Sequence, residues 1–134
     1  MRKIIVVSIL WFVCVVGNVS ANEIKLDMTK FGGCDDSKMP QVHIGDVVTL
    51  NFAIPHGPEL VIGDPDEQWF NVTPIKFTKL KEFRLNVKEA EGRSGKEKKH
   101  IFGKAGSYVI QMGSEMNSES PNIDASCTIN FVDQ

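Results

Sequence analysis

From residue 22 onward, apolar and polar side chains alternate with a period of two through most of the apolar segments of the chain. Ile24, Leu26 and Met28, for example, alternate with charged residues. Successive side chains of a β-strand point to opposite faces of a sheet, so this pattern is typical of strands that bury one face. Helical periodicity is weak, and we restrict the helical candidates to residues 73–82 or 88–97.

The alternation predicts about eight short strands, separated by turn residues at the spacing typical of sandwiches and barrels. We expect them at residues 23–28, 41–44, 47–52, 60–62, 69–72, 82–87, 108–112 and 127–131. No segment between them suits the crossover helix that a parallel sheet requires. We therefore predict an all-β fold, an antiparallel β-sandwich in which residues 22–134 form a single domain. The expected core includes Leu26, Val48, Leu50, Phe52, Leu60, Ile62, Phe70, Phe83, Leu85, Phe102, Tyr108, Ile110, Ile129 and Phe131.

Residues 1–21 have the parts of a secretory signal peptide. Arg2 and Lys3 are followed by an apolar run over residues 4–16 and by small residues up to Ala21, after which we expect cleavage. The run of about 13 residues is shorter than the about 20 that a membrane-spanning helix needs. We expect a mature chain without a transmembrane segment, periplasmic or secreted, from a bacterial host. An uncleaved membrane anchor is the alternative interpretation of the same pattern.

Two cysteines remain after the signal segment, Cys34 and Cys127, one near each end of the mature chain. Two cysteines in an exported protein usually pair, because the compartment is oxidising. A redox-active pair is usually closely spaced, as in Cys-x-x-Cys, and this pair is not. The sequence therefore predicts one structural disulfide between Cys34 and Cys127.

The charge balance argues against nucleic acid as a partner. The whole chain has a net charge of −2, and removal of residues 1–21 takes away Arg2 and Lys3 but no acidic residue. Nucleic-acid binding requires positive charge along the phosphate backbone. We therefore expect no nucleic-acid partner.

The closing segment, residues 102–110, has the sequence Phe-Gly-Lys-Ala-Gly-Ser-Tyr-Val-Ile. This pattern resembles the penultimate hairpin of small secreted β-sandwiches, namely cupredoxin-like domains and bacterial pre-peptidase C-terminal domains. The resemblance implies an Ig/cupredoxin-like sandwich in which Gly106 takes a special backbone angle. It also implies that Tyr108 packs in a corner with its hydroxyl bonded to the backbone. The blue-copper ligands of cupredoxins are not matched, because residues 103–134 contain no His.

No motif predicts a cofactor or a catalytic centre. The chain lacks a Gly-x-Ser-x-Gly nucleophile elbow and a His-Glu-x-x-His metalloprotease motif. His43, His56 and Met39 are weak candidates for metal ligands, since none of them has the close ligand spacing of a dedicated site. We expect no cofactor, no bound metal and no enzymatic activity.

A basic run is the first expected place for partner docking. Lys96, Lys98 and Lys99 belong to a locally basic segment of an acidic protein, which suits an anionic partner such as a glycan. The competing interpretation is a solvated loop of mixed charge with no specific partner.

A polar loop predicted over residues 113–126 is the second expected place. It carries Glu115, Asn117 and Glu119, and loops of this length are often functional. Phe31 or Trp69 is the expected aromatic anchor of such a surface.

These features predict an exported, non-catalytic binding or accessory protein, with an unknown protein or an anionic glycan as its partner. The first alternative is an exported copper-handling protein of cupredoxin-like architecture. The second is a small inhibitor of an external hydrolase that presents a disulfide-braced loop.

Overall fold

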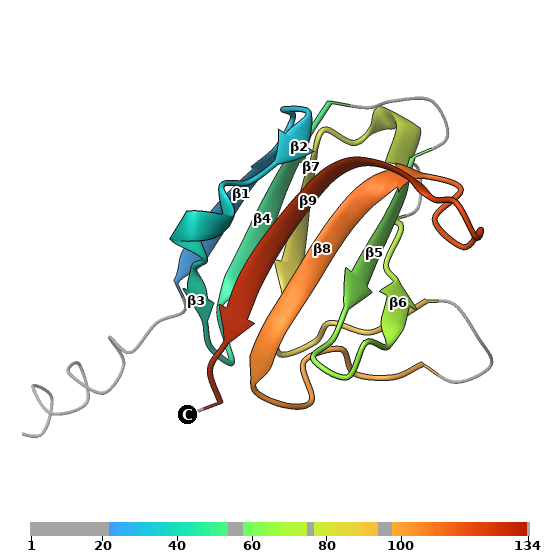
Figure 1. Cartoon of the computed structure of the whole chain (residues 1–134). Coiled ribbons are helices and arrows are strands. Elements are labelled where there is room, and N and C mark those ends of the chain that lie inside the picture. The colour runs from blue at the N-terminus through green and yellow to red at the C-terminus, as the bar shows by residue number, and fades with distance from the viewer. Residues whose placement is uncertain (1–21, 54–57, 75–76, 94–97, 134) are drawn as a thin grey trace, which may run out of the picture.

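The computed structural model describes residues 22–53, 58–74, 77–93 and 98–133, and these residues contain nine strands and two short 3₁₀-helices (Figure 1). The N-terminal half contains β1 (Glu23–Met28), β2 (Gly32–Gly33), η1 (Asp36–Lys38), β3 (Gln41–Val42), β4 (Val47–Phe52) and β5 (Glu59–Gly63). The C-terminal half contains β6 (Trp69–Asn71), η2 (Phe77–Lys79), β7 (Glu82–Asn86), β8 (Gly106–Ser114) and β9 (Asn122–Phe131).

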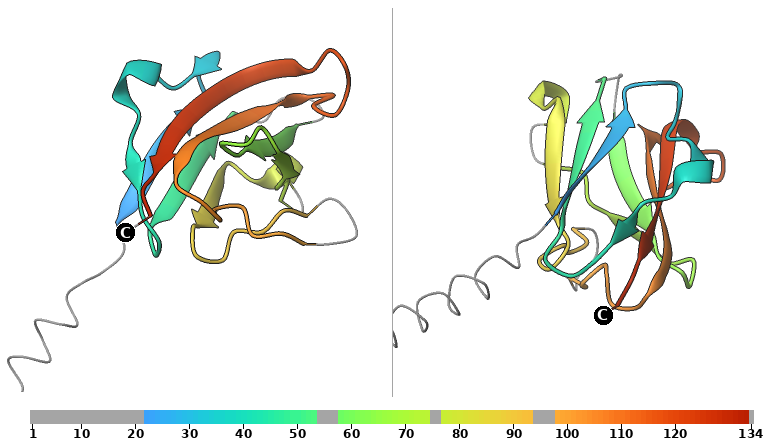
Figure 2. Two further views of the ribbon diagram at one scale, coloured as in Figure 1. Left: turned by 60° about the horizontal axis from the view of Figure 1, so that its bottom comes forward. Right: turned by 90° about the vertical axis from the view of Figure 1, so that its left-hand side faces the viewer.

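The strands form two sheets that lie face to face as two layers (Figure 2). The first sheet has the order β1-β4-β7, and the second has the order β2-β9-β8-β5-β6, with β3 also paired to β9. In Figure 1 the second sheet lies in front of the first. We call the end at which β8 turns into β9, at the top of Figure 1, the upper end. The all-β prediction is confirmed.

The prediction of purely antiparallel sheets is wrong. Strand β1 pairs parallel with β4, and β2 and β3 both pair parallel with β9, whereas the other ladders are antiparallel. Between β1 and β4 the chain crosses to the second sheet and runs back along the edge of β9. It therefore re-enters the first sheet from the end at which β1 began, and the two strands share a direction. Alternation in the sequence specifies the buried face of a strand but not its direction.

The core lies between the two sheets and contains nearly all of the residues expected there. Phe70 and Phe83 are the exceptions, since they are only partly buried. Both lie on strands at a sheet edge, β6 and β7, where one flank of the side chain is open. Burying each large apolar side chain contributes about 1.5–3 kcal/mol. The core also contains Val42 and Val72 from the predicted strands, and Phe77, Ala90 and Ile101 from segments outside the predicted strands.

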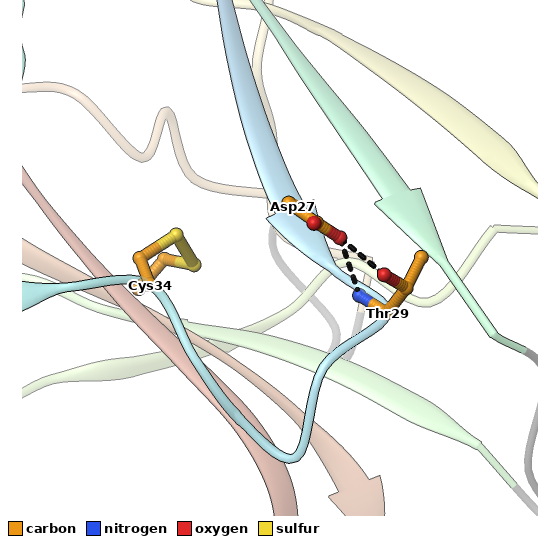
Figure 3. The surroundings of a disulfide bond; sticks show 4 residues. Asp27, Thr29 and Cys34 are labelled. Carbon is orange, nitrogen blue, oxygen red and sulfur yellow. Dashed lines mark hydrogen bonds between the residues drawn. A yellow bond between two sulfur atoms is a disulfide. The ribbon is translucent and has the colours of Figure 1, made fainter.

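The predicted disulfide between Cys34 and Cys127 is confirmed (Figure 3). Their Cα atoms lie 4.8 Å apart across a sequence separation of 93 residues. Cys127 lies on the inner face of β9 and is fully buried, while Cys34 follows β2 directly. The bond therefore ties the start of the described chain to its last strand.

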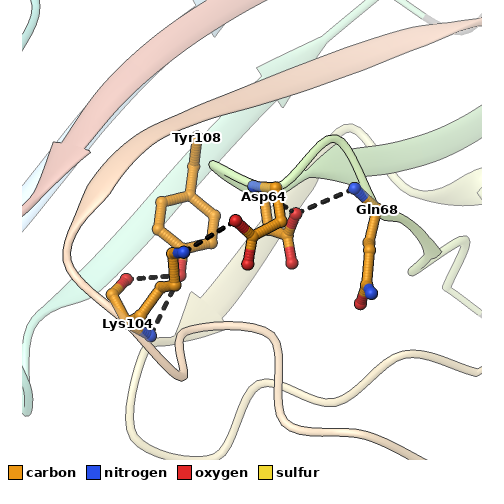
Figure 4. A network of polar contacts seen from close by, with 5 residues as sticks. Asp64, Gln68, Lys104 and Tyr108 are labelled. Carbon is orange, nitrogen blue, oxygen red and sulfur yellow. Dashed lines mark hydrogen bonds and ion pairs between the residues drawn. The ribbon is translucent and has the colours of Figure 1, made fainter.

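The tyrosine corner implied by the closing hairpin is present (Figure 4). The Tyr108 hydroxyl donates a hydrogen bond of 2.6 Å to the carbonyl oxygen of Lys104, and its buried ring lies 4.7 Å from the ring of Phe102. Gly106 has a φ of +142°, and a Cβ atom there would come within 2.6 Å of Pro65. Glycine is therefore required at the start of β8.

The expected polar loop and the expected helical segments differ from the structure. β8 continues to Ser114 and β9 begins at Asn122, so the polar loop predicted over residues 113–126 is limited to residues 115–121. The ladder extends through a bulge at Met112/Gly113, because strand pairing needs backbone groups rather than apolar side chains. Of the helical candidate at residues 73–82, the described part contains one short helix, η2, and the described residues 88–93 of the other candidate contain no helix.

The expected signal peptide, residues 1–21, lies outside the described residues. Among the residues that are described, no helix has the length and apolar character needed to cross a bilayer.

Removal of the disulfide is expected to destabilise the fold strongly. The double variant Cys34→Ala/Cys127→Ala should lose about 4–5 kcal/mol of unfolding free energy, because the bond closes a long loop and restricts the unfolded chain. Urea denaturation of the variant and of the reduced and oxidised wild-type protein measures this loss. An equal unfolding midpoint with and without reductant would contradict it.

Candidate functional site

Phe31 and Trp69 are the exposed aromatic residues in the part of the chain that the structure describes. Phe31 is 93% exposed and Trp69 is 53% exposed. One or the other was expected as the anchor of a binding surface. They lie far apart, because Phe31 follows β1 at the upper end, whereas Trp69 begins β6 at the opposite end. The structure therefore presents two separate candidate surfaces.

Phe31 stands on a tight turn, residues 29–33, which we call the Phe31 turn. At its start, the amide of Thr29 donates a 2.9 Å hydrogen bond to Asp27 Oδ1, and the Thr29 hydroxyl donates to the same oxygen (Figure 3). At its end, the amide of Gly33 donates a 3.0 Å hydrogen bond to the carbonyl oxygen of Lys30. Hydrogen bonds therefore fix the backbone on both sides of Phe31.

The second sheet fixes the far side of the Phe31 turn. Gly32 and Gly33 have φ values of +91° and +88° and pair with Ala125 and Ser126 of β9. A Cβ atom on Gly33 would lie 2.4 Å from the carbonyl oxygen of Ser126, so only glycine fits this approach. The neighbouring disulfide at Cys34 adds a covalent brace. The turn is therefore preorganised before any partner binds.

A depression of about 250 Å³ lies beneath the Phe31 turn. Its floor includes Met28 and Met112, which are buried side chains from the two sheets, and its edge includes Lys30 and Asp124. Methionine side chains are flexible and polarisable, so they adapt to apolar groups of different shapes. An apolar centre with charged groups around it is typical of protein-binding surfaces.

Sequence reasoning did not single out this depression. Its lining combines β1, β8, β9 and the residue after β4, so no single segment carries the signal. The two consecutive glycines after Phe31 were the available signal in the sequence, because glycine readily takes a positive φ.

The predicted docking residues do not form one surface. Glu115, Asn117 and Glu119 are exposed on the loop between β8 and β9 at the upper end. Lys98 and Lys99 are exposed before the start of β8, and Lys96 lies outside the described residues. β8 has nine residues, and a strand of that length spans about 30 Å. The basic segment and the acidic loop therefore lie at opposite ends of the sandwich.

Two of the weak metal candidates have structural contacts. His43 Nδ1 lies 3.7 Å from Asp46 Oδ2, and the same carboxylate accepts hydrogen bonds from the amides of Asn22 (3.1 Å) and His43 (2.8 Å). Met39 Sδ lies 4.0 Å from the Ser107 hydroxyl. His56 lies outside the described residues. Within the described ranges, no three His, Cys, Asp or Glu side chains gather as a metal-binding group.

No protein-family profile matches the sequence, and no curated protein matches it significantly. The Phe31 turn and the surface around Trp69 are therefore interpreted from their own chemistry.

The Phe31 turn is expected to respond to acid. The hydroxyl and amide hydrogen bonds from Thr29 hold the pKa of Asp27 below its ordinary value of 3.8. The hydrogen bonds from Thr29 to the Asp27 carboxylate are therefore intact above pH 3.8 and are lost as the pH falls through this lowered pKa. In an NMR titration, the amide signal of Thr29 should shift with a midpoint below 3.8.

Asp35 provides the matched control for this titration. Its pKa is also lowered, by the hydroxyl and amide of Ser37. Asp27→Asn should abolish the acid-dependent shift of Thr29, and Asp35→Asn should leave it unchanged. A midpoint at or above pH 3.8 for the Thr29 amide signal would show that the hydrogen bonds from Thr29 to Asp27 do not form.

Proposed function

We propose that this chain is an exported, non-catalytic binding protein that docks a partner protein through the Phe31 turn. The observation that carries this proposal is the 93% exposure of Phe31 on a turn braced by hydrogen bonds, glycines and a disulfide. The backbone of a braced turn loses little conformational freedom on binding, and exposed aromatic side chains dominate the energetics of many interfaces.

The surroundings of Phe31 indicate the chemistry of the partner. The partner should insert an apolar group beside Phe31, above Met28 and Met112, and should place polar groups near Lys30 and Asp124. The exposed acidic residues Glu115 and Glu119 lie at the same end. They favour a partner whose flanking surface is basic, because opposite charges steer the encounter.

Export is part of this proposal. The disulfide supports it, since such bonds persist in oxidising compartments such as the periplasm and the exterior of the cell. The signal-like pattern of residues 1–21 supports it independently.

We also propose that the sandwich is of the cupredoxin-like type that the closing hairpin resembles. Gly106 and Tyr108 support this assignment through the corner geometry described above. Copper handling stays a prediction, and calorimetric titration with copper tests it.

The Phe31 turn favours a second candidate function, inhibition of an external hydrolase. A braced turn with a protruding aromatic side chain is suited to enter a substrate cleft. Inhibition assays on lysozymes and secreted proteases, with wild-type protein and Phe31→Ala, test this function. The wild-type protein should inhibit one of the enzymes, and the variant should not.

Substitution of Phe31 tests the docking proposal. Phe31→Ala should weaken binding of the partner by about thirtyfold or more, as expected for a central aromatic anchor. Its unfolding free energy should change by less than about 0.5 kcal/mol, because Phe31 has no role in the core. The measurement is capture of proteins from the envelope or medium of the host, followed by affinity determination for each captured protein.

Trp69→Ala is the matched control, since it removes an exposed aromatic from a distant surface. A captured protein that is retained by the wild type and by Trp69→Ala but lost with Phe31→Ala supports the proposal. An identical set of captured proteins for the wild type and Phe31→Ala would refute it.

A further inference from the structure

One part of the outer face of the second sheet, which we call the Trp69 face, combines polar side chains with apolar ones and carries no charge. On β8 and β9 the inward residues alternate with outward residues, and the ladders align the outward residues in rows. One row contains Trp69, Gly63, Val109 and Thr128; the next contains Asn71, Val61, Gln111 and Ser126; the third contains Ser107, Asn130 and Gln41. In Figure 1 this face is turned toward the viewer.

The lack of charge on this face is distinctive. Charged residues make up 24% of the chain, yet none of the positions in these three described rows carries a charge. Charged residues lie beside the face instead: Glu59 takes the next outward position of β5, and Lys104 Nζ forms an ion pair of 2.7 Å with Asp66 Oδ1 (Figure 4). The face is therefore suited to a ligand that is polar and neutral.

Trp69 is positioned on this face by the sheet itself. A Cβ atom on Gly63 would lie 2.9–3.0 Å from three carbon atoms of the indole ring, so the ring rests against the sheet where glycine leaves room. The turn before Trp69 is held by Asp64 Oδ1, which accepts hydrogen bonds from the amides of Asp66 (2.9 Å) and Gln68 (2.8 Å) (Figure 4). More than half of Trp69 nevertheless stays exposed, at 53%.

We infer that this outer face is a binding site for a neutral oligosaccharide or polysaccharide. An aromatic ring packs against the apolar C–H face of a sugar ring and has a quadrupole that attracts polarised C–H groups. Gln111, Ser126 and Thr128 supply amide and hydroxyl groups that both donate and accept, as sugar hydroxyls do.

The size of the face supports a chain of sugars. The row from Trp69 to Thr128 crosses β6, β5, β8 and β9, which are three interstrand steps. At about 4.8 Å for each step this row is about 14 Å long, which exceeds a single sugar ring. The site adjoins the Phe31 turn at Ser126, which pairs with Gly33, but its argument does not use Phe31 and so does not depend on the docking proposal.

The experiment is a fluorescence titration, because Trp69 is the one tryptophan of residues 22–134. The probes are β-glucan, xylan, mannan, galactan and chitin oligosaccharides, with polygalacturonate and alginate oligosaccharides as anionic counterparts. We expect a shift of the Trp69 emission and saturable binding with at least one neutral probe. We also expect the affinity to change little between low and high salt, because no charge pairs form.

Variants separate a binding role of Trp69 from a structural one. Trp69→Ala should weaken binding at least about tenfold, Trp69→Phe should retain part of the affinity, and Gln111→Ala should also weaken it. Phe31→Ala should bind like the wild type. Affinity electrophoresis in gels that contain the polysaccharide measures the variants that lack Trp69.

Three outcomes would overturn the inference. The first is that none of the neutral probes binds. The second is binding to anionic probes alone, abolished by salt, and the third is equal affinity of Trp69→Ala and the wild type. Self-association of the chain through this face, detected as a dimer by sedimentation and lost in Trp69→Ala, would assign the face to a second copy instead.

Discussion

Strand β9 organises both the sheet and the N-terminal part of the chain through its backbone pairing. Nine of its ten residues pair with β8 along one edge, and β2 and β3 pair with it along the other. Its inner face supplies Cys127, Ile129 and Phe131 to the core, and Cys127 adds a covalent link to Cys34. A strand from the C-terminal end of the chain therefore holds the N-terminal residues 32–42 in place by hydrogen bonds, apolar burial and a disulfide.

Both candidate surfaces follow from this arrangement. The Phe31 turn is attached to β9 through Gly32 and Gly33, so the exposed aromatic has a rigid support. The face around Trp69 exists because β8 and β9 bury every second side chain and direct the others outward. Phe31 lies at one end of the fold, and the face around Trp69 lies on the outer side of the second sheet.

Local patterns in the sequence are sufficient to predict which side chains of a strand are buried, but not where the strand lies in the sheet or which way it runs. Leu26, Val48 and Ile110 were assigned to the core from alternation alone and are buried, since the side-chain period of a strand is a local property. Phe70 and Phe83 are less buried than expected because their strands lie at sheet edges, which is a property of the whole sheet. Strand direction was also predicted wrongly, because the path from β1 to β4 through the other sheet is set by distant pairing.

From the sequence alone, alternation predicted most of the residues that face the interior, and the two cysteines predicted the bond between Cys34 and Cys127. The resemblance of residues 102–110 to small secreted β-sandwiches implied the corner of Gly106 and Tyr108. Each of these depends on neighbouring residues or on there being two cysteines in residues 22–134. Only the tertiary structure decided that Phe31 stands exposed on a braced turn and that Trp69 shares an uncharged face with Gln111 and Thr128. The physical reason is that these surfaces are assembled by hydrogen bonds between strands far apart in the chain, whose register no single segment encodes.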